Sequence, residues 1–272
     1  WGVHRTFGYP GDATNGTLGA PGRVDGDPEL IQVRHEEMAA FMACGHAKVT
    51  GEVGVCLATS GPGAIHLLNG LYDARMDHAP VVAIVGQQPR AALGGHQQQE
   101  VDLPNLFKDV ASEYVQTVMV SEQLPAVVDR AVRIAKARRT VTCLVIPHDV
   151  QELEAVEETP RELKSLPTSA AYSEPRVVPR DEDLRRAAEV LNAGEKVAML
   201  IGAGAPGAAR GGAQVGGRLG ARGGQARLAQ GVLPDDLPFV TGAIGLLGTR
   251  PSWELMQGCD TLLLVGTGFP YA

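Results

Sequence analysis

The chain has 272 residues, of which 44% are hydrophobic and 20% are charged, and its formal net charge is −7. This much apolar material can bury a sizeable core, so the composition excludes a disordered chain. All of the net charge lies before residue 180, so neither half offers the basic surface of a nucleic-acid-binding protein. The longest apolar runs are of strand length, and we expect no integral membrane segment.

The cysteines indicate a reducing compartment. Four of them are far apart, stand in apolar surroundings and form no Cys-x-x-Cys pair: Cys44, Cys56, Cys143 and Cys259. We interpret them as reduced core thiols of a cytoplasmic protein. The chain starts with Trp1 rather than Met, and no basic segment precedes its first apolar run. We therefore expect an N-terminal piece of a longer protein.

Short β-rich runs alternate with Ala-rich segments of helix length through residues 1–149. Six strands are predicted there: Val3–Phe7, Leu30–Val33, Val53–Thr59, Val81–Gln87, Tyr114–Val118 and Val141–Ile146. Several of these runs lack polar alternation, as expected when helices cover both faces of a parallel sheet. We therefore expect a doubly wound, six-stranded parallel α/β domain.

Residues 150–180 contain several prolines and a cluster of glutamates without a sustained period, which predicts a linker. A second unit, residues 181–272, begins with Asp181 as the expected N-cap of a helix that ends at Ala193. Two strands are predicted to follow: Val197–Ile201 and Thr261–Val265. This pattern indicates a second parallel-sheet α/β unit that is truncated.

One stretch of the second unit departs from this pattern. Between residues 207 and 231, nine glycines and four arginines stand where a helix is expected. Each glycine in a helix interior costs about 1 kcal/mol relative to alanine. We therefore expect poor order in this stretch.

Three motifs of other enzyme classes are incomplete. Residues 202–207 fit the dinucleotide-binding pattern G-x-G-x-x-G. The acid that binds the ribose should follow after about twenty residues, but the next acidic residue is Asp235. Pro206 also lacks the backbone N–H that could face a phosphate. We favour a plain strand-to-helix turn there over nicotinamide binding. Residues 35–39 begin like a zinc-peptidase helix, but Ala39 replaces the second histidine ligand, so no metal site is predicted. Ser60 lacks the glycines of a nucleophile elbow.

Two features remain, and both follow predicted strands, where open α/β sheets bind ligands. Glu36 stands at the start of an Ala-rich helix. The turn Ser60–Gly63 ends one strand and opens a helix from Ala64, so that backbone amides can face a ligand. An alternative for Glu36 alone is a first-turn acid that the helix dipole favours.

Five motifs stand in an order that resembles the pyrimidine-binding domain of thiamine diphosphate enzymes. They are Phe7–Asp12, Val33–Glu36, Thr59–Gly63, Asn69–Ala74 with Asp77 and Pro80, and Val85–Gln87. The resemblance is greatest to the pyruvate oxidase and acetolactate synthase group. Residues 232–238 and 264–266 are similar to that group's central domain, which holds FAD in several members.

The resemblance implies roles for particular residues. Glu36 would be catalytic, because the family's glutamate hydrogen-bonds the aminopyrimidine ring of thiamine diphosphate and so promotes loss of the proton from the thiazolium carbon. The implied cofactor-binding residues are Pro10, Gly11, Glu36, Ser60, Gly61, Pro62, Gly63 and Asn69, with Gly202 and Gly204 near a possible FAD. Gln87 and Gln99 would contact substrate, with a solvated loop as the alternative for residues 95–100. Gln98 replaces the family's aromatic residue there.

The resemblance also implies what lies elsewhere. The family holds the diphosphate and Mg²⁺ with a Gly-Asp-Gly motif followed by Asn-Asn, and this sequence contains neither. We therefore expect the Mg²⁺ ligands to lie outside this chain, the active site to form at the interface of a homo-oligomer, and the chain alone to be inactive. The expected reaction is decarboxylation of pyruvate or a similar 2-oxo acid, as in pyruvate oxidase. Acetolactate synthase and a catalytically silent binding or assembly module are the alternatives.

Overall fold

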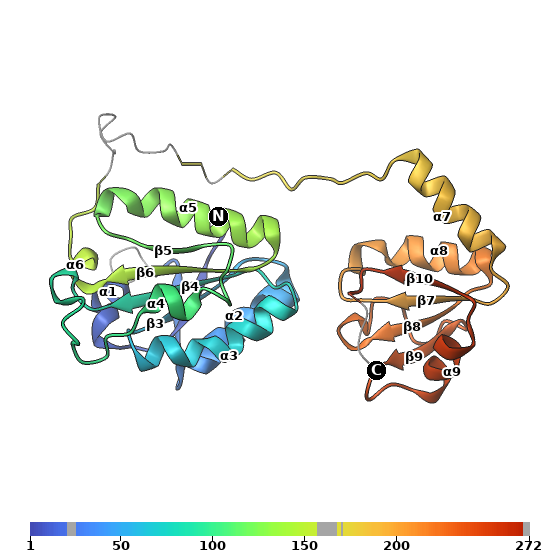
Figure 1. Ribbon diagram of the computed structural model, residues 1–272, viewed down its shortest axis with the longest axis horizontal. Coiled ribbons are helices and arrows are strands. Elements are labelled where there is room, and N and C mark those ends of the chain that lie inside the picture. Colours follow the sequence, from blue (N-terminus) through green and yellow to red (C-terminus); the bar gives the residue numbers. More distant parts are fainter. Residues whose placement is uncertain (21–25, 157–167, 170, 269–272) are drawn as a thin grey trace. The chain divides into compact units, whose positions relative to one another are not determined.

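The protein consists of two compact units, Trp1–Pro175 and Arg176–Ala272. The computed structural model describes residues 1–20, 26–156, 168–169 and 171–268 (Figure 1). Each unit is a parallel β-sheet covered by helices. Among the described helices, none is both long and apolar enough to cross a membrane.

The first unit is built on a six-stranded, wholly parallel sheet in the order β2-β1-β3-β4-β6-β5. Its strands are β1 Arg5–Gly8, β2 Glu29–Gln32, β3 Gly54–Ala58, β4 Val81–Gln87, β5 Val115–Thr117 and β6 Val141–Pro147. All six predicted strands are therefore confirmed, with ends that differ by up to two residues. The central strands β3 and β6 are buried along their whole length, because helices lie on both faces.

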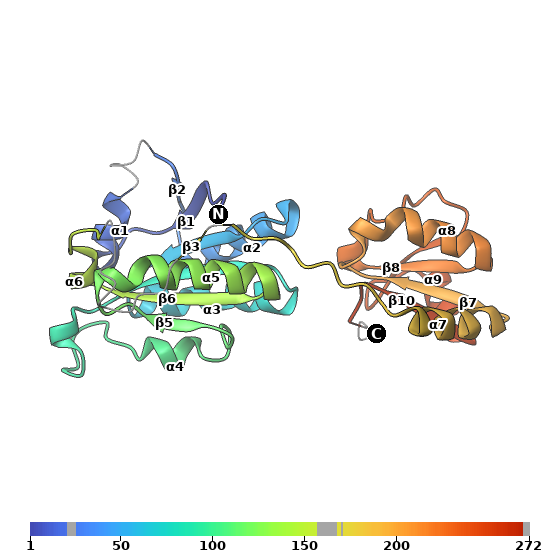
Figure 2. The same ribbon diagram turned by 90° about the horizontal axis from the view of Figure 1, so that it is seen from above.

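Helices divide between the two faces of this sheet. Their bounds are α1 Asn15–Gly19, α2 Glu36–Thr50, α3 Pro62–Met76, α4 Leu103–Phe107, α5 Leu124–Arg138 and α6 His148–Gln151. The alanines of α2 and the leucines of α3 belong to one buried cluster, whereas the inner side of α5 belongs to another. Figure 1 shows α2 and α3 on one face and α5 on the other, and Figure 2 shows α5 running along β6. The doubly wound prediction is confirmed.

The order of the strands creates a point where the chain reverses its direction across the sheet. From β1 the chain continues to β2 on one side and returns to β3 on the other. The loops after β1 and β3 therefore diverge at the carboxyl edge of the sheet, at the place where open α/β sheets usually bind ligands. The segments Pro10–Gly11 and Ser60–Gly63 follow these two strands.

The second unit has a four-stranded parallel sheet in the order β10-β7-β8-β9. Its elements are α7 Asp181–Ala193, β7 Val197–Ile201, α8 Ala209–Leu219, β8 Arg222–Ala226, β9 Val240–Ile244, α9 Arg250–Gly258 and β10 Thr261–Val265. The bounds of β7 and β10 match the prediction. Helices α8 and α9 cover opposite faces. Gly223 faces Met199, whose end also packs against Gly216 of α8, while the next residue, Gly224, faces Ser252 of α9. The parallel-sheet prediction for this unit is confirmed.

Two predictions for the second unit are wrong. Residues 207–231 form α8 and β8 rather than a poorly ordered stretch, because tertiary packing outweighs the low helix propensity of glycine. Gly216 lies buried against Met199, and Gly220 ends α8 in a left-handed conformation that suits glycine. The N-cap of α7 is Arg180 rather than Asp181, which is the first helical residue.

The predicted linker lies partly outside the described residues, since 157–167 and 170 are not described. The described part after this gap contacts the first unit. Arg133 of α5 donates to the carbonyl oxygens of Ser169 and Ala171, and the Tyr172 ring lies 6.4 Å from that of Trp1, centroid to centroid. The first compact unit accordingly includes residues up to Pro175.

Candidate functional site

Thr59 packs between the loops that follow β1 and β3. A Cβ on Gly11 would lie 2.5 Å from Thr59 Cβ, and a Cβ on Gly63 would lie 2.7 Å from Thr59 Cγ2. The Thr59 hydroxyl also accepts a hydrogen bond from the Ala13 amide at 3.2 Å. Only glycine leaves room for this contact on either side, so the two predicted cofactor-binding glycines are brought together by the same threonine.

The turn Ser60–Gly63 has the geometry of a close backbone approach. Gly61 has φ 59°, and a Cβ there would lie 2.7 Å from the carbonyl oxygen of Gln99. Pro62 is the first residue of α3, where its missing N–H costs nothing. The helix thus begins two residues earlier than the predicted start at Ala64. Ser60 is fully buried, whereas Pro10 is exposed.

Helix α2 begins at Glu36, as predicted. His35 caps it, because its Nδ1 accepts the Glu37 amide hydrogen at 3.2 Å. Nδ1 of His35 therefore carries no proton, and the neutral ring has its hydrogen on Nε2. Glu36 is 8% exposed, although its position in the first turn would allow an acid to point into solvent.

The Glu36 carboxylate lies between α2 and α3. Its Oε2 lies 3.0 Å from Nδ1 of His66, one turn into α3, and its Oε1 would lie 3.2 Å from a Cβ on Gly63. Since an ionised carboxylate only accepts hydrogen bonds, the His66 Nδ1–H is the donor. One oxygen is thus bonded within the protein, and the other lies on the glycine side of the turn.

Three side chains that could ligate a metal ion meet here. Ligand atoms of His35, Glu36 and His66 all lie within 4.8 Å of one another, the one such group of three found among the described residues. One polar atom of each side chain has a protein partner, since His35 Nδ1 accepts from the Glu37 amide and His66 Nδ1 donates to Glu36 Oε2. The two imidazole rings also lie against each other, with centroids 4.4 Å apart and planes tilted by 33°. The cluster is a hydrogen-bonded group whose ligand types could also hold a zinc-like cation.

A second network holds α2 and α3 together behind the site. Lys48 Nζ lies 2.9 Å from Asp73 and 2.6 Å from Asp77, and the Cys44 thiol donates to Asp73 at 3.2 Å. Burial and the neighbouring Asp73 raise the pKa of Cys44 to about 12. Burial acts to raise the pKa of Asp73 as well, but the hydrogen bonds from Lys48 and Cys44 prevail and lower it. This network fixes the pair of helices that carries Glu36 and His66.

Asn69 lies on the exposed side of the same helix pair. Its side-chain amide donates to the carboxylate of Glu37, the neighbour of Glu36. Asn69 is therefore close to the start of α2, and its amide N–H is engaged there.

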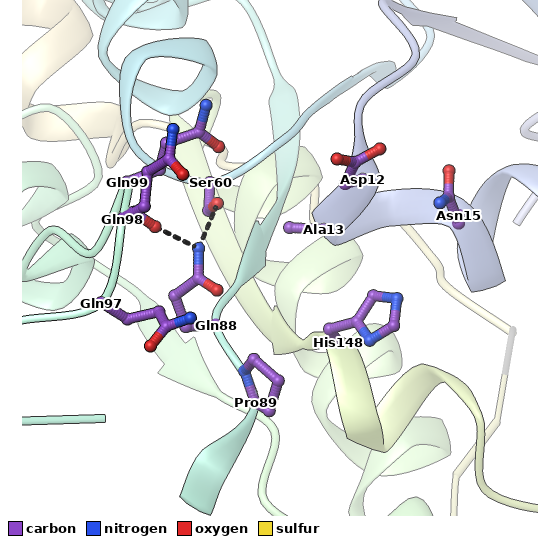
Figure 3. A pocket seen from close by; sticks show the side chains of 10 residues that line it. All are labelled: Asp12, Ala13, Asn15, Ser60, Gln88, Pro89, Gln97, Gln98, Gln99 and His148. Carbon is purple, nitrogen blue, oxygen red and sulfur yellow. Dashed lines mark hydrogen bonds between the residues drawn. The ribbon is translucent and has the colours of Figure 1, made fainter. Parts of the chain in front are cut away.

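Beyond Ser60 lies a polar pocket of about 320 Å³ (Figure 3). Its lining residues are Asp12, Ala13, Asn15, Ser60, Gln88, Pro89, Gln97, Gln98, Gln99 and His148. The side-chain amide of Gln88 donates to the Ser60 hydroxyl at 3.3 Å and to the backbone carbonyl oxygen of Gln98 at 2.9 Å. Gln99, one of the predicted substrate contacts, thus lines this pocket.

Gln87, the other predicted substrate contact, is 4% exposed. Its side-chain amide donates to the Val101 carbonyl oxygen at 2.9 Å, and its side-chain oxygen accepts the backbone N–H of Gln88 at 2.9 Å. The side chain thus ties the end of β4 to the segment after the glutamine run, and the next residue, Gln88, faces the pocket.

Two acidic side chains shape the loops around this pocket. Glu100 accepts the amide hydrogens of Gly94 and Gln97, and these bonds lower the pKa of its carboxyl. Asp149 accepts from the backbone amide and the Nε of Arg90 at 2.9 and 2.7 Å, which lowers its pKa although burial opposes the shift. The loop is thus held in a defined conformation, in which His96 and Gln99 both have positive φ.

The glycine turn of the second unit is packed differently. A Cβ on Gly202 would lie 2.3 Å from the Gly266 carbonyl oxygen, after β10. The amides of Gly202 and Gly204 donate to the carbonyl oxygens of Val265 and Gly266 at 2.8 and 2.9 Å. The glycines therefore permit the turns after β7 and β10 to touch, and these two amides are bonded within the protein.

Thr59, His66 and Gln88 were not among the predicted site residues, although Thr59 begins one of the five motifs. A signal existed for His66, because it stands three residues after Gly63 and so shares a helix face with it. For Gln88 there was none, since consecutive glutamines at a strand end do not reveal which one faces the ligand edge. The thiol prediction holds for three cysteines, which are buried and free, whereas Cys259 is only half-buried.

Known proteins resemble this chain over both units. Residues 1–106 match the family model of the thiamine pyrophosphate enzyme N-terminal TPP binding domain, and residues 184–272 match that of the central domain. The putative thiamine pyrophosphate-containing protein YdaP of Bacillus subtilis is 38% identical over 271 residues, all of this chain and 46% of that protein.

Two relatives with different activities are about equally similar. Pyruvate oxidase of Lactiplantibacillus plantarum is 33% identical over 275 residues, all of this chain and 44% of that enzyme. The large subunit of acetolactate synthase isozyme 2 of Escherichia coli is 34% identical over 276 residues, 98% of this chain and 47% of that protein. The chain thus spans about half the length of these relatives. With its two matching domains and its two parallel α/β units, the chain belongs to the thiamine pyrophosphate enzyme family.

Proposed function

We propose that this chain supplies the pyrimidine-binding half of a thiamine diphosphate site in an enzyme that decarboxylates pyruvate or a similar 2-oxo acid. The observation that carries the proposal is the position of Glu36. Its carboxylate is nearly enclosed at the carboxyl edge of the sheet, with Oε1 beside Gly63 and Oε2 bonded to His66. A carboxylate so placed can hold or move one proton at Oε1.

The residues present fit the uncharged aminopyrimidine ring of the cofactor. A Cβ on Gly63 would lie 3.2 Å from Glu36 Oε1, so glycine at this position avoids crowding that oxygen. When bound, thiamine diphosphate supplies the carbon nucleophile that adds to a 2-oxo acid and accepts electrons as carbon dioxide leaves. We assign Glu36 to the ring nitrogen, and Gly11 and the turn Ser60–Gly63 to the walls beside the ring. Gln99 is assigned to substrate, and Gln88 joins it on the same pocket.

The diphosphate needs a divalent cation with oxygen ligands, which we place outside this chain. We also propose a homo-oligomer in which a second copy completes the site. Its support is an exposed apolar stripe along the paired helices α2 and α3, formed by Met38, Met42, Val49, Ile65, Tyr72 and Met76. The substitution Met42→Lys should lower the oligomeric state in sedimentation, whereas Val177→Lys, at an exposed position outside the stripe, should not.

The central experiment replaces Glu36 with Gln in the protein that contains this chain. Gln still forms hydrogen bonds but cannot exchange a proton, so exchange of the thiamine C2 proton should fall by about 100-fold to 10,000-fold. Glu52→Gln, the same change at an exposed acid of the first unit, serves as the matched control. A wild-type exchange rate in the Glu36 variant would overturn the proposal, and tight cofactor binding without turnover of any 2-oxo acid would favour a silent binding module.

Acetolactate synthesis is the second candidate, supported by the similarity to acetolactate synthase at 34% identity. The two reactions differ in their products. Acetolactate from two molecules of pyruvate would establish the synthase, whereas acetate or acetyl phosphate with electron transfer to an acceptor would establish the oxidase. Product analysis with labelled pyruvate therefore decides between them.

A flavin in the second unit is a separate proposal. In this sheet the chain leaves β7 toward β8 and returns to β10 on its other side, so the Gly202–Gly204 turn also lies where an open sheet reverses. If the purified protein has no flavin absorption band and does not bind added FAD, the proposal of a flavin site in the second unit is wrong.

A further inference from the structure

His66 is the side chain whose contacts the proposed role of Glu36 leaves unexplained. Its ring lies at the start of α3, its side chain is 43% exposed, and its Nδ1 is 3.0 Å from Glu36 Oε2. The Glu36 side chain is 11% exposed. The pair therefore differs from a surface ion pair, in which two mobile side chains are both hydrated and contribute little.

The orientation of the His66 ring is determined by its neighbours. The His35 ring packs against it with a centroid distance of 4.4 Å and a tilt of 33°, and His35 is itself held as the cap of α2. The backbone of α3 is anchored to α2 through Lys48 and Asp73. A donor fixed in this way restrains the carboxylate that accepts from it, because rotation of that carboxylate would break the hydrogen bond.

We propose that His66 is a positioning residue for Glu36, whose Nδ1–H occupies Oε2 and so leaves Oε1, on the Gly63 side, as the oxygen that meets the cofactor. This inference rests on the proposed function of Glu36. It explains why a nearly enclosed carboxylate has one oxygen bonded within the protein and the other beside a glycine. Misplacement of a reacting group by about 1 Å costs on the order of 100-fold in rate, so the restraint is of consequence.

The test compares three replacements of His66 in the protein that contains this chain. Asn carries an N–H where the imidazole carries Nδ1, Gln carries its N–H one bond farther out, and Leu has no donor. We expect the rate of thiamine C2 proton exchange to fall about 10-fold to 100-fold in His66→Leu and His66→Gln. The rate should stay within a few-fold of wild type in His66→Asn. Cofactor affinity should change less than the exchange rate in all three.

Two further variants make the result specific. His78→Asn, an exposed histidine just after α3, controls for loss of a histidine elsewhere. In a Glu36→Gln background, His66→Leu should reduce the exchange rate no further, because a positioning residue acts only through the group it positions. An additional 10-fold fall in the double variant would contradict the proposal.

The outcomes separate this inference from the proposed function. If Glu36→Gln abolishes exchange while His66→Leu and His66→Gln retain the wild-type rate, Glu36 keeps its role and the positioning role of His66 is wrong. If His66→Asn falls as far as His66→Leu, the donor at the Nδ1 position is not what matters, and the inference fails likewise. If Glu36→Gln itself retains the wild-type rate, the proposed function and this inference both fall.

Discussion

Each unit places a glycine-containing turn after a strand that borders the reversal point of its sheet, and the two units use this turn differently. In the first unit, Gly63 makes room for Thr59 and for a carboxylate oxygen of Glu36. In the second unit, Gly202 makes room for the turn after β10, and its amide donates to Val265. A glycine turn at the carboxyl edge of a parallel sheet is therefore not in itself a ligand site. What distinguishes the first turn is the side chains that neighbouring elements direct at it.

Gly202→Ala should have the largest effect, because the new Cβ would meet backbone atoms 2.3 Å away. We expect the free energy of unfolding of the second unit to fall by about 3 kcal/mol or more, with or without ligands. Trp253 reports on this unit by fluorescence once Trp1 is changed to Phe. Gly207→Ala, whose Cβ would find nothing within 4 Å among the described residues, is the control in the same loop. Equal stability of the two variants would contradict the packing role.

Gly63→Ala should damage the site more than the fold. Its Cβ would lie 2.7 Å from Thr59 Cγ2. This overpacking should lower the unfolding free energy of the first unit by about 1 to 3 kcal/mol. Thr59→Ser removes that methyl group, so the double variant should regain stability in denaturant titrations. C2 proton exchange should remain reduced, because the new Cβ still lies 3.2 Å from Glu36 Oε1. Full recovery of exchange would show that Gly63 serves packing alone.

The glycines of α8 should be a reserve of stability that the two glycines of α3, Gly63 and Gly70, do not offer, because a Cβ on either would clash. Gly212→Ala and Gly217→Ala add a Cβ with nothing within 4 Å among the described atoms, so each should raise the unfolding free energy of the second unit by about 0.5 to 1 kcal/mol. Gly216→Ala should not, since its Cβ would lie 2.7 Å from the end of Met199. Denaturant titration of the three variants tests this order, which a uniform gain would contradict.

Acid should weaken the first unit before the second, with the smallest effect of the four. The pKa values of Asp73 and Asp149 are lowered in the fold, so both carboxylates stabilise it above the unfolded pKa, near 4, and this contribution is lost as pH falls through the folded values. Among the described residues of the second unit, the carboxyl with a lowered pKa is that of Asp260, which accepts a hydrogen bond from the Thr261 side chain and is exposed.

The measurement for this last prediction is the unfolding free energy of each unit between pH 3 and pH 7, roughly the range that spans carboxyl titration. Asp73→Asn should flatten the pH dependence of the first unit and leave that of the second unchanged. A variant that retains the full acid sensitivity of the first unit would show that the Lys48 network does not cause it.

Much of the fold could be predicted from the sequence because its signals are local. Apolar runs without alternation indicated buried parallel strands, and β4, β7 and β10 have the predicted bounds. Glu36 at a helix start was also predictable. The failure at α8 has the opposite cause, since glycine propensity is a weak local preference and packing against Met199 overrides it.

The site was predictable only in part, because its contacts join residues far apart in the chain. Glu36 and His66 are thirty residues apart, and Ser60 and Gln88 are twenty-eight apart. Gln87 and Gln88 are adjacent in the sequence, yet one is buried in backbone contacts and the other lines the pocket.

By itself, then, the sequence determined two parallel α/β units, the loops at their carboxyl edges and the carboxylate that begins α2. Periodicity and turn residues act within a few positions of one another, so these features needed no tertiary information. The tertiary structure alone decided which oxygen of Glu36 is bonded to His66 and which glycine amides are bonded within the protein. Those outcomes depend on the strand order β2-β1-β3-β4-β6-β5 and on how α3 packs against α2, which bring together side chains that no local pattern connects.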